Sequence, residues 1–160
     1  MPISERIPMT PRGYKILQDE LKRLTSVERP KIVKEIEEAR AHGDISENAE
    51  FHAAKEHQAQ IEARIRLVND RMGRAQIIDP KGQSDDRVRF GATVEVEDSE
   101  SGERLTWTLV GEDEADAKEG RISVTSPIAR ALLGKELDAT VQIQVPRGTR
   151  EVVVLAIRYE

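Results

Sequence analysis

Three acidic residues follow a glycine in the segment RAHGDISENAEF, residues 40–51. Asp44 and Glu47 are three residues apart and Glu50 follows three further on, so on a helix these carboxylates can point outward together. Their mutual repulsion is relieved when a cation lies between them, and Mg²⁺ takes one or two carboxylates together with waters and substrate phosphates. Two carboxylates are too few for a tight site. The spacing therefore predicts part of a two-metal phosphoryl-transfer site that another protein completes.

The same segment also has a purely structural interpretation. Gly43 can take the left-handed conformation that ends a helix, Asp44 can cap the next helix, and Glu47 then completes a capping box. Arg40 and Lys55, which flank the segment, can either contact a phosphate backbone or lie on solvated helix faces. Local sequence leaves both interpretations open.

The residues on either side of this segment have a helical period. Thr10 followed by Pro11 is a helix start signal, and apolar residues then recur every three or four positions. Ser26 and Pro30 predict a kink in this first helix without a break. A second helical stretch continues to residue 76. The expected apolar positions of the two helices are Tyr14, Leu17, Leu21, Leu24, Ile32, Ile36 and Ala39, and Ala49, Ala53, Ile61, Ile65, Val68, Met72 and Ala75.

Two apolar seams of similar length, joined by a few residues, predict an antiparallel coiled-coil hairpin. Residues 17–24 should face residues 65–72, and the small side chains of Ala39, Ala49 and Ala53 should meet near the turn. Each arm of about 30 residues rises about 1.5 Å per residue, or about 45 Å in total. The acidic segment then lies at the end of a long, thin rod, which favours a role beyond the turn itself.

Beyond the hairpin the apolar period changes to two. Residues 79–86, DPKGQSDD, combine turn residues with charges, so we expect a hairpin domain at 1–78, a linker at 79–87 and a second domain at 88–160. The second domain is expected to be an antiparallel sheet with one short helix, which makes the fold class α+β. Its expected strands are 93–97, 105–110, 122–124, 140–145 and 152–159, with a helix from Ser126 to about Leu133 that stops at Gly134.

Composition narrows the classes of function. The chain has no cysteine, and charged residues make up 34% of it, so a disulfide framework is excluded and a reducing cytoplasm fits. No apolar run approaches the roughly 20 residues that span a bilayer, so we expect no membrane contact, and a monomer is the default. Residues 81–160 hold 11 basic and 16 acidic residues, a net charge of −5, which argues against free duplex DNA as a partner.

Three histidines raise the possibility of zinc. His52 and His57 are five residues apart and fall on different helix faces, unlike zinc ligands four residues apart, and His42 precedes the turn. A zinc site is therefore not expected. The sequence also contains no nucleotide-binding or nucleophile motif.

Long segments of the chain resemble a known family. GDISENAEFHAAKEHQAQIEARI resembles the tip and second helix of bacterial transcription elongation factors of the Gre family, and VTSPIARALLGKELDATVQIQVP resembles their C-terminal domain. The similarity extends from IPMTPRGYKILQDELKRL to the final strand and is greatest to the GreA branch. It implies a coiled coil that enters the secondary channel of RNA polymerase and an FKBP-like C-terminal domain that docks at the channel rim.

The resemblance also implies residue roles at the hairpin tip. Asp44 and Glu47 correspond to the catalytic carboxylates, which hold Mg²⁺ jointly with RNA polymerase and stimulate the polymerase's own cleavage of backtracked RNA. The chain itself is then not an enzyme. Arg40 and Lys55 fall where family members carry basic residues near the 3′ end of the nascent RNA.

The resemblance maps the polymerase-docking loop onto Thr125, Ser126 and Pro127. Two other functions stay open. The same rod could plug the polymerase channel without promoting cleavage. The FKBP-like fold raises prolyl isomerisation, although the second domain has too few aromatic residues to line a proline pocket. These aromatic residues are Phe90, Trp107 and Tyr159.

Overall fold

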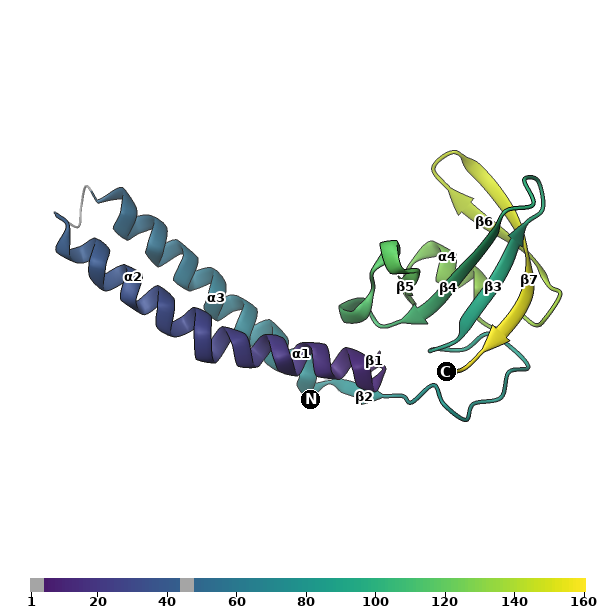
Figure 1. Ribbon diagram of the computed structural model, residues 1–160, viewed down its shortest axis with the longest axis horizontal. Coiled ribbons are helices and arrows are strands. Elements are labelled where there is room, and N and C mark those ends of the chain that lie inside the picture. Colours follow the sequence, from purple (N-terminus) through teal and green to yellow (C-terminus); the bar gives the residue numbers. More distant parts are fainter. Residues whose placement is uncertain (1–4, 44–47) are drawn as a thin grey trace. The chain divides into compact units, whose positions relative to one another are not determined.

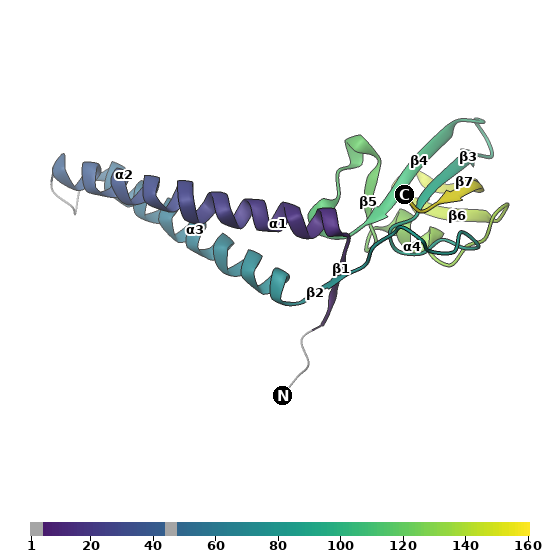
Figure 2. The same ribbon diagram turned by 60° about the horizontal axis from the view of Figure 1, so that its bottom comes forward.

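The computed structural model describes residues 5–43 and 48–160. Its contacts divide the chain into a hairpin unit, Lys15–Arg74, and a sheet unit formed by Met1–Tyr14 with Ala75–Glu160. Figures 1 and 2 show the paired helices and the curled sheet from two directions. The α+β fold class with an N-terminal helical hairpin is thereby confirmed.

The N-terminal residues group with the sheet unit because they pair with residues beyond the hairpin. Strand β1 (Ile7–Met9) pairs in parallel with β2 (Ala75–Ile77), and the sequence predicted neither strand. The second helix therefore ends at Gly73 and not at residue 76. The contacts place one unit boundary after Tyr14 and another after Arg74, whereas the sequence predicted a single boundary at the linker 79–87.

The hairpin starts where the sequence indicated. The Thr10 hydroxyl oxygen accepts a hydrogen bond of 3.0 Å from the Gly13 N–H, which caps the first turn. The first arm then runs without interruption to residue 41, and the second arm lies beside it (Figure 1). The helical segments are α1 (Pro11–Arg23), the π-helical η1 (Leu24–Glu28), α2 (Arg29–Ala41) and α3 (Ala49–Gly73).

The irregularity expected near Ser26 and Pro30 is a π-helical segment. The Arg29 N–H donates to the carbonyl of Leu24, five residues earlier, and the Thr25 hydroxyl donates to the carbonyl of Leu21 at 2.9 Å. The helix thus continues through the segment, as predicted, with one extra residue in a turn.

The seam between the helices is mostly the predicted one. Leu17, Leu24, Ile32 and Ala39 are buried on the first arm, and Ile61, Ile65 and Val68 on the second. The prediction of Ala49 and Ala53 was wrong, because both are exposed and Ala54 and Gln58 are half-buried in their place. Counting back from Ile61 in steps of three and four reaches 58 and 54, so the seam keeps one heptad phase along α3.

Two bidentate ion pairs join the arms. Arg29 donates from Nε and Nη2 to the Glu62 carboxylate at 2.8 and 2.9 Å, and Arg64 donates to Glu20 through two bonds of 2.6 Å. The bond from Arg64 lowers the pKa of Glu20, and the bond from Arg29 lowers the pKa of Glu62. In each pair the guanidinium makes two hydrogen bonds to one carboxylate, and this geometry fixes the register of one helix on the other.

The sheet unit contains all five predicted strands, in the order β5-β4-β3-β7-β6. Three of the four strand pairs are antiparallel, but β4 and β5 are parallel, because the segment between them contains two 3₁₀ turns instead of a tight hairpin. The expected short helix is α4. The elements are β3 (Thr93–Asp98), β4 (Arg104–Val110), η3 (Glu112–Glu114), η4 (Ala117–Glu119), β5 (Arg121–Ser123), α4 (Pro127–Leu132), β6 (Thr140–Val145) and β7 (Gly148–Arg158).

The core of this unit is one cluster of alternating strand residues with α4. Ala129 and Leu132 of α4 pack with the strand residues that face the same side of the sheet. Gly134 has φ of 82° and ends the helix as expected. Within the described ranges, every helix is too short or too polar to cross a membrane.

Candidate functional site

The end of the hairpin is where the sequence placed its chemistry. Helix α2 ends at Ala41, and the His42 N–H bonds to the Ala39 carbonyl at 3.2 Å. Asp44 and Glu47, the predicted magnesium ligands, lie outside the described residues. The structure does describe the residues directly before and after them.

Asn48, and not Asp44, is the N-cap of α3. Its side-chain oxygen accepts a bond of 3.0 Å from the Phe51 N–H, so the capping box suggested for Asp44 and Glu47 does not begin this helix. Gly43 does not take the left-handed conformation either. The sequence contained the signal, because Asn48 is a strong cap residue directly before the first helical position, but Asp44 is equally good on type alone.

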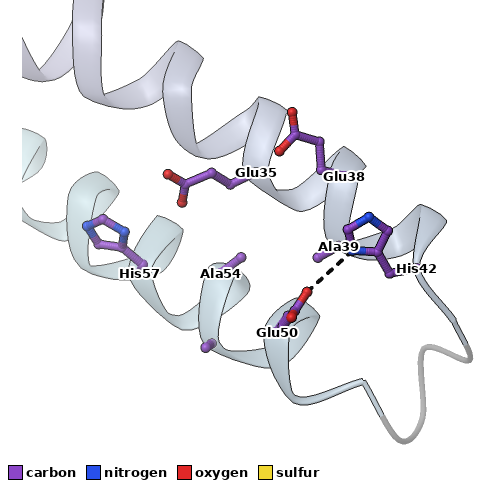
Figure 3. A pocket seen from close by; sticks show the side chains of 8 residues that line it. Glu35, Glu38, Ala39, His42, Glu50, Ala54 and His57 are labelled. Atoms are coloured by element: carbon purple, nitrogen blue, oxygen red, sulfur yellow. Dashed lines mark hydrogen bonds and ion pairs between the residues drawn. The ribbon is translucent and has the colours of Figure 1, made fainter.

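Asn48 also reaches the other helix. Its amide nitrogen donates to the carbonyl of Ala39 in the last turn of α2. A second contact joins the same two helix ends, since His42 Nδ1 lies 3.5 Å from a carboxylate oxygen of Glu50 (Figure 3). The two helices are therefore connected by side chains on both sides of the segment that carries the predicted acids.

A cavity of about 440 Å³ lies between α2 and α3 beside these contacts. Figure 3 shows its carboxylates and imidazoles coming from both helices. Across residues 5–43 and 48–160, no three histidine or acidic side chains come close enough to hold a metal ion. The residues that line the cavity are Glu35, Glu38, Ala39, His42, Glu50, Ala53, Ala54 and His57.

The two basic residues predicted to contact RNA come from different arms. Arg40 is exposed in the last turn of α2. Lys55 is exposed on α3, and its Nζ donates to Gln58 at 3.1 Å. Both cations are thus accessible on the helical turns next to the tip, and neither lines the cavity.

The predicted docking segment is a hydrogen-bonded turn that leads into α4. The Ser126 hydroxyl caps α4 by accepting a 3.2 Å bond from the Ala129 N–H, and Pro127 takes the first helical position. The Thr125 hydroxyl lies 2.7 Å from the Ser123 hydroxyl, and the Ser123 Oγ also accepts from the Thr125 N–H. The three predicted residues are therefore adjacent and held by local hydrogen bonds.

A mainly apolar groove of about 400 Å³ adjoins this turn. Ser126 and Pro127 line it together with Val145, the last residue of β6, and Pro146. Thr125 is exposed and is not one of the residues that line the groove. The groove offers apolar surface next to polar groups, which is typical of a protein-binding site.

Comparison with known proteins decides the family. Residues 7–77 match the family described as “Transcription elongation factor, N-terminal”, and residues 83–159 match “Transcription elongation factor, GreA/GreB, C-term”. The chain belongs to the GreA/GreB family of transcription elongation factors. The two GreA/GreB matches cover the hairpin and the sheet in turn, so the resemblance found in the sequence is confirmed.

Relatives in this GreA/GreB family match over nearly their whole length. Transcription elongation factor GreA of Anaeromyxobacter sp. (strain K) is 56% identical over 155 residues, which cover 97% of this chain and 93% of that protein. GreA of Hyphomonas neptunium (strain ATCC 15444) is 53% identical over 156 residues, which cover 98% and 99%. The solved structure of the transcription factor Gfh1 is 32% identical, covers 98% of this chain and 99% of that chain, and has a TM-score of 0.47.

Proposed function

We propose that this protein is a transcript-cleavage factor that inserts its hairpin into the secondary channel of RNA polymerase and stimulates the polymerase's own cleavage of backtracked nascent RNA. The observation that carries the proposal is the family match across both units. The helical hairpin supports it, because the acidic segment connects the ends of two paired helices, α2 and α3.

In this proposal Asp44 and Glu47 act together with the polymerase. Carboxylate oxygens are the ligands that Mg²⁺ prefers, and two of them leave most coordination positions to other groups. When held in the polymerase, Mg²⁺ would stabilise negative charge at the reacting phosphate and activate water. The isolated chain should therefore leave RNA intact and should not act as an enzyme alone.

Arg40 and Lys55 would position the RNA. Both side chains are exposed on the helical turns that flank the tip, one on each helix. Cations at these positions can contact phosphates of the RNA 3′ segment without reading its sequence. We assign them to substrate placement and not to the chemical step.

Thr125, Ser126 and Pro127 would dock the sheet unit on the polymerase. The cap and the hydroxyl pair hold this turn before any partner binds, which lowers the entropy cost of association. The adjoining groove would receive an apolar side chain from the polymerase. Docking and cleavage are thus assigned to different parts of the chain.

The decisive experiment uses backtracked elongation complexes with labelled RNA and Mg²⁺. The wild-type chain should release short 3′ fragments, while Asp44→Asn and Glu47→Gln should reduce the maximal rate by about a hundredfold or more, because each removes a charged ligand. Since Asn48 caps α3, neither substitution removes the helix cap. Wild-type cleavage by both variants would refute the proposed chemistry.

Two controls separate the alternatives. Thr125→Ala should raise the protein concentration that gives half-maximal cleavage and leave the maximal rate unchanged, whereas Thr149→Ala, at an exposed position on β7, should change neither. A protein that slows nucleotide addition without releasing fragments would instead be a channel-plugging regulator. Faster cis/trans exchange of a proline peptide without polymerase would indicate an isomerase.

A further inference from the structure

One side chain connects the two helix ends that flank the acidic segment. The Asn48 carboxamide uses its oxygen to accept from the Phe51 N–H in α3 and its nitrogen to donate to the Ala39 carbonyl in α2. A cap requires only the first bond. The second bond goes to a carbonyl that already accepts from the His42 N–H at 3.2 Å, so its effect is to join the two helices and not to satisfy the end of α2.

Because of the position of Asn48 in the chain, these two hydrogen bonds bear on the acidic segment. Residues 44–47 connect Gly43 to Asn48, so the acidic segment begins and ends on the two turns that Asn48 holds together. Among the described residues, the contact between His42 and Glu50 is weaker: the pair is 3.5 Å long, and both side chains are about 70% exposed. Asn48 is half-buried and makes the shorter, more shielded contacts.

We infer that Asn48 is a positioning residue for cleavage, which clamps α2 to α3 so that the carboxylates beside it reach the polymerase's metal in one geometry. This inference rests on the proposed function. The reaction rate depends strongly on where the reacting groups are placed, since a displacement of about 1 Å can lower the rate about a hundredfold. Asn48 itself touches neither RNA nor metal in this role.

The amide nitrogen distinguishes a clamp from an ordinary cap. Aspartate and serine are good N-cap residues, so Asn48→Asp and Asn48→Ser keep an acceptor for the Phe51 N–H. Aspartate places a carboxylate oxygen opposite the Ala39 carbonyl, and serine is too short to reach that carbonyl and adds no charge. Both variants should therefore keep the helix but lose the bond between the helices.

The test measures cleavage of backtracked RNA against protein concentration for the wild type, Asn48→Asp, Asn48→Ser and the control Asn69→Asp. Asn69 is exposed on the same helix. Both Asn48 variants should lower the maximal rate on the order of tenfold or more and change the half-maximal concentration by less than about twofold, because docking belongs to the sheet unit. Asn69→Asp should match the wild type.

Two results would overturn the inference. The first is a wild-type maximal rate for both Asn48 variants. The second is a loss seen only as a higher half-maximal concentration with reduced helical circular dichroism, which would mean a general structural role. Asp44→Asn in the same assay separates the two proposals: if it loses cleavage while the Asn48 variants do not, only the clamp is wrong, and if it cleaves normally, the proposed function is wrong.

Discussion

The sheet unit buries thirteen hydrophobic residues in one cluster, whereas the described arms of the hairpin unit bury seven along a single seam. Side chains of the sheet are enclosed by neighbouring strands and by α4, but each seam residue has one opposing helix and solvent on both sides. The hairpin supplements its thin core with ion pairs between the arms, Arg29 with Glu62 and Arg64 with Glu20. A narrow unit buries little apolar surface, so polar contacts between its helices have to supply part of its stability.

Core truncations give the largest expected difference between the units. Ile143→Ala in β6, where the side chain is fully buried, should lower the free energy of unfolding of the sheet unit by about 4 kcal/mol. Ile65→Ala in the seam should cost the hairpin about 2 kcal/mol, because the gap lies beside solvent and can relax. Urea unfolding followed by Trp107, the single tryptophan, reports the sheet, and circular dichroism at 222 nm reports the helices. Equal losses would contradict the contrast.

Acid should weaken the sheet unit in part through Asp98. Backbone N–H groups of Ser101 and Glu100, with Arg150, lower the pKa of Asp98 from 3.8 to about 2, the bond from Ser101 contributing most. A carboxyl with a lowered folded pKa stabilises the fold above its unfolded pKa, and this stabilisation is lost as pH falls from about 4 to about 2. Asp98→Asn should flatten that part of the pH dependence, measured by Trp107 fluorescence in urea. If Asp98→Asn leaves the loss of stability at acid pH unchanged, Asp98 is not the source of that loss.

A smaller effect is expected for the ion pairs of the hairpin. Arg64→Met keeps the aliphatic stem but loses both bonds to Glu20, and should cost about 1 kcal/mol, since the pair is partly exposed. The pKa of Glu20 is lowered in the fold, so this contribution is present above its ordinary value of 4.5 and disappears as pH falls through the folded value. Lys15→Met, which breaks an exposed pair on one helix, is the matched control and should have little effect.

The sequence predicted the parts of the fold that depend on local period. Alternation in residues 93–97 and 140–145 located β3 and β6, and steps of three and four located most of the seam. The pairing of β1 with β2 was missed because three residues, one of them Pro8, give no period to detect. The parallel pairing of β5 was missed because the alternation that locates a strand does not show whether it pairs parallel or antiparallel to its neighbour.

For the candidate site, the sequence identified the region but not the contacts within it. Asp44 and Asn48 are both good caps, and a pattern of types cannot choose between them. The bond from Asn48 to Ala39 joins residues nine positions apart across the turn, so it depends on how the helices pack. Arg40 and Lys55 were suggested by their place beside the acidic segment and then by resemblance, and the 125–127 turn by resemblance alone. The structure shows that Arg40, Lys55 and Thr125 are exposed.

The smallest effect on stability is expected in the π-helical turn η1, where the first arm contains one residue more than a regular seam requires. Leu17 to Leu24 and Ile32 to Ala39 are separated by seven residues, but Leu24 to Ile32 are separated by eight. At about 100° per residue, seven residues rotate about 700°, close to two full turns, whereas eight overshoot by about 80°. The π-helical turn absorbs that extra residue, which explains why the seam stays continuous past Pro30.

Deleting the exposed Ser26 should therefore convert this segment to a regular α-helix with the seam still in phase. The hairpin should keep its helical circular dichroism and its free energy of unfolding within about 1 kcal/mol, because no buried contact is lost. Deleting the exposed Gln18 is the matched control: it separates Leu17 from Leu24 by six residues, rotates Leu17 out of the seam by about 100° and should cost several kcal/mol. If the two deletions are equally damaging, the π-helical turn is required by the hairpin and is not merely the accommodation of one inserted residue.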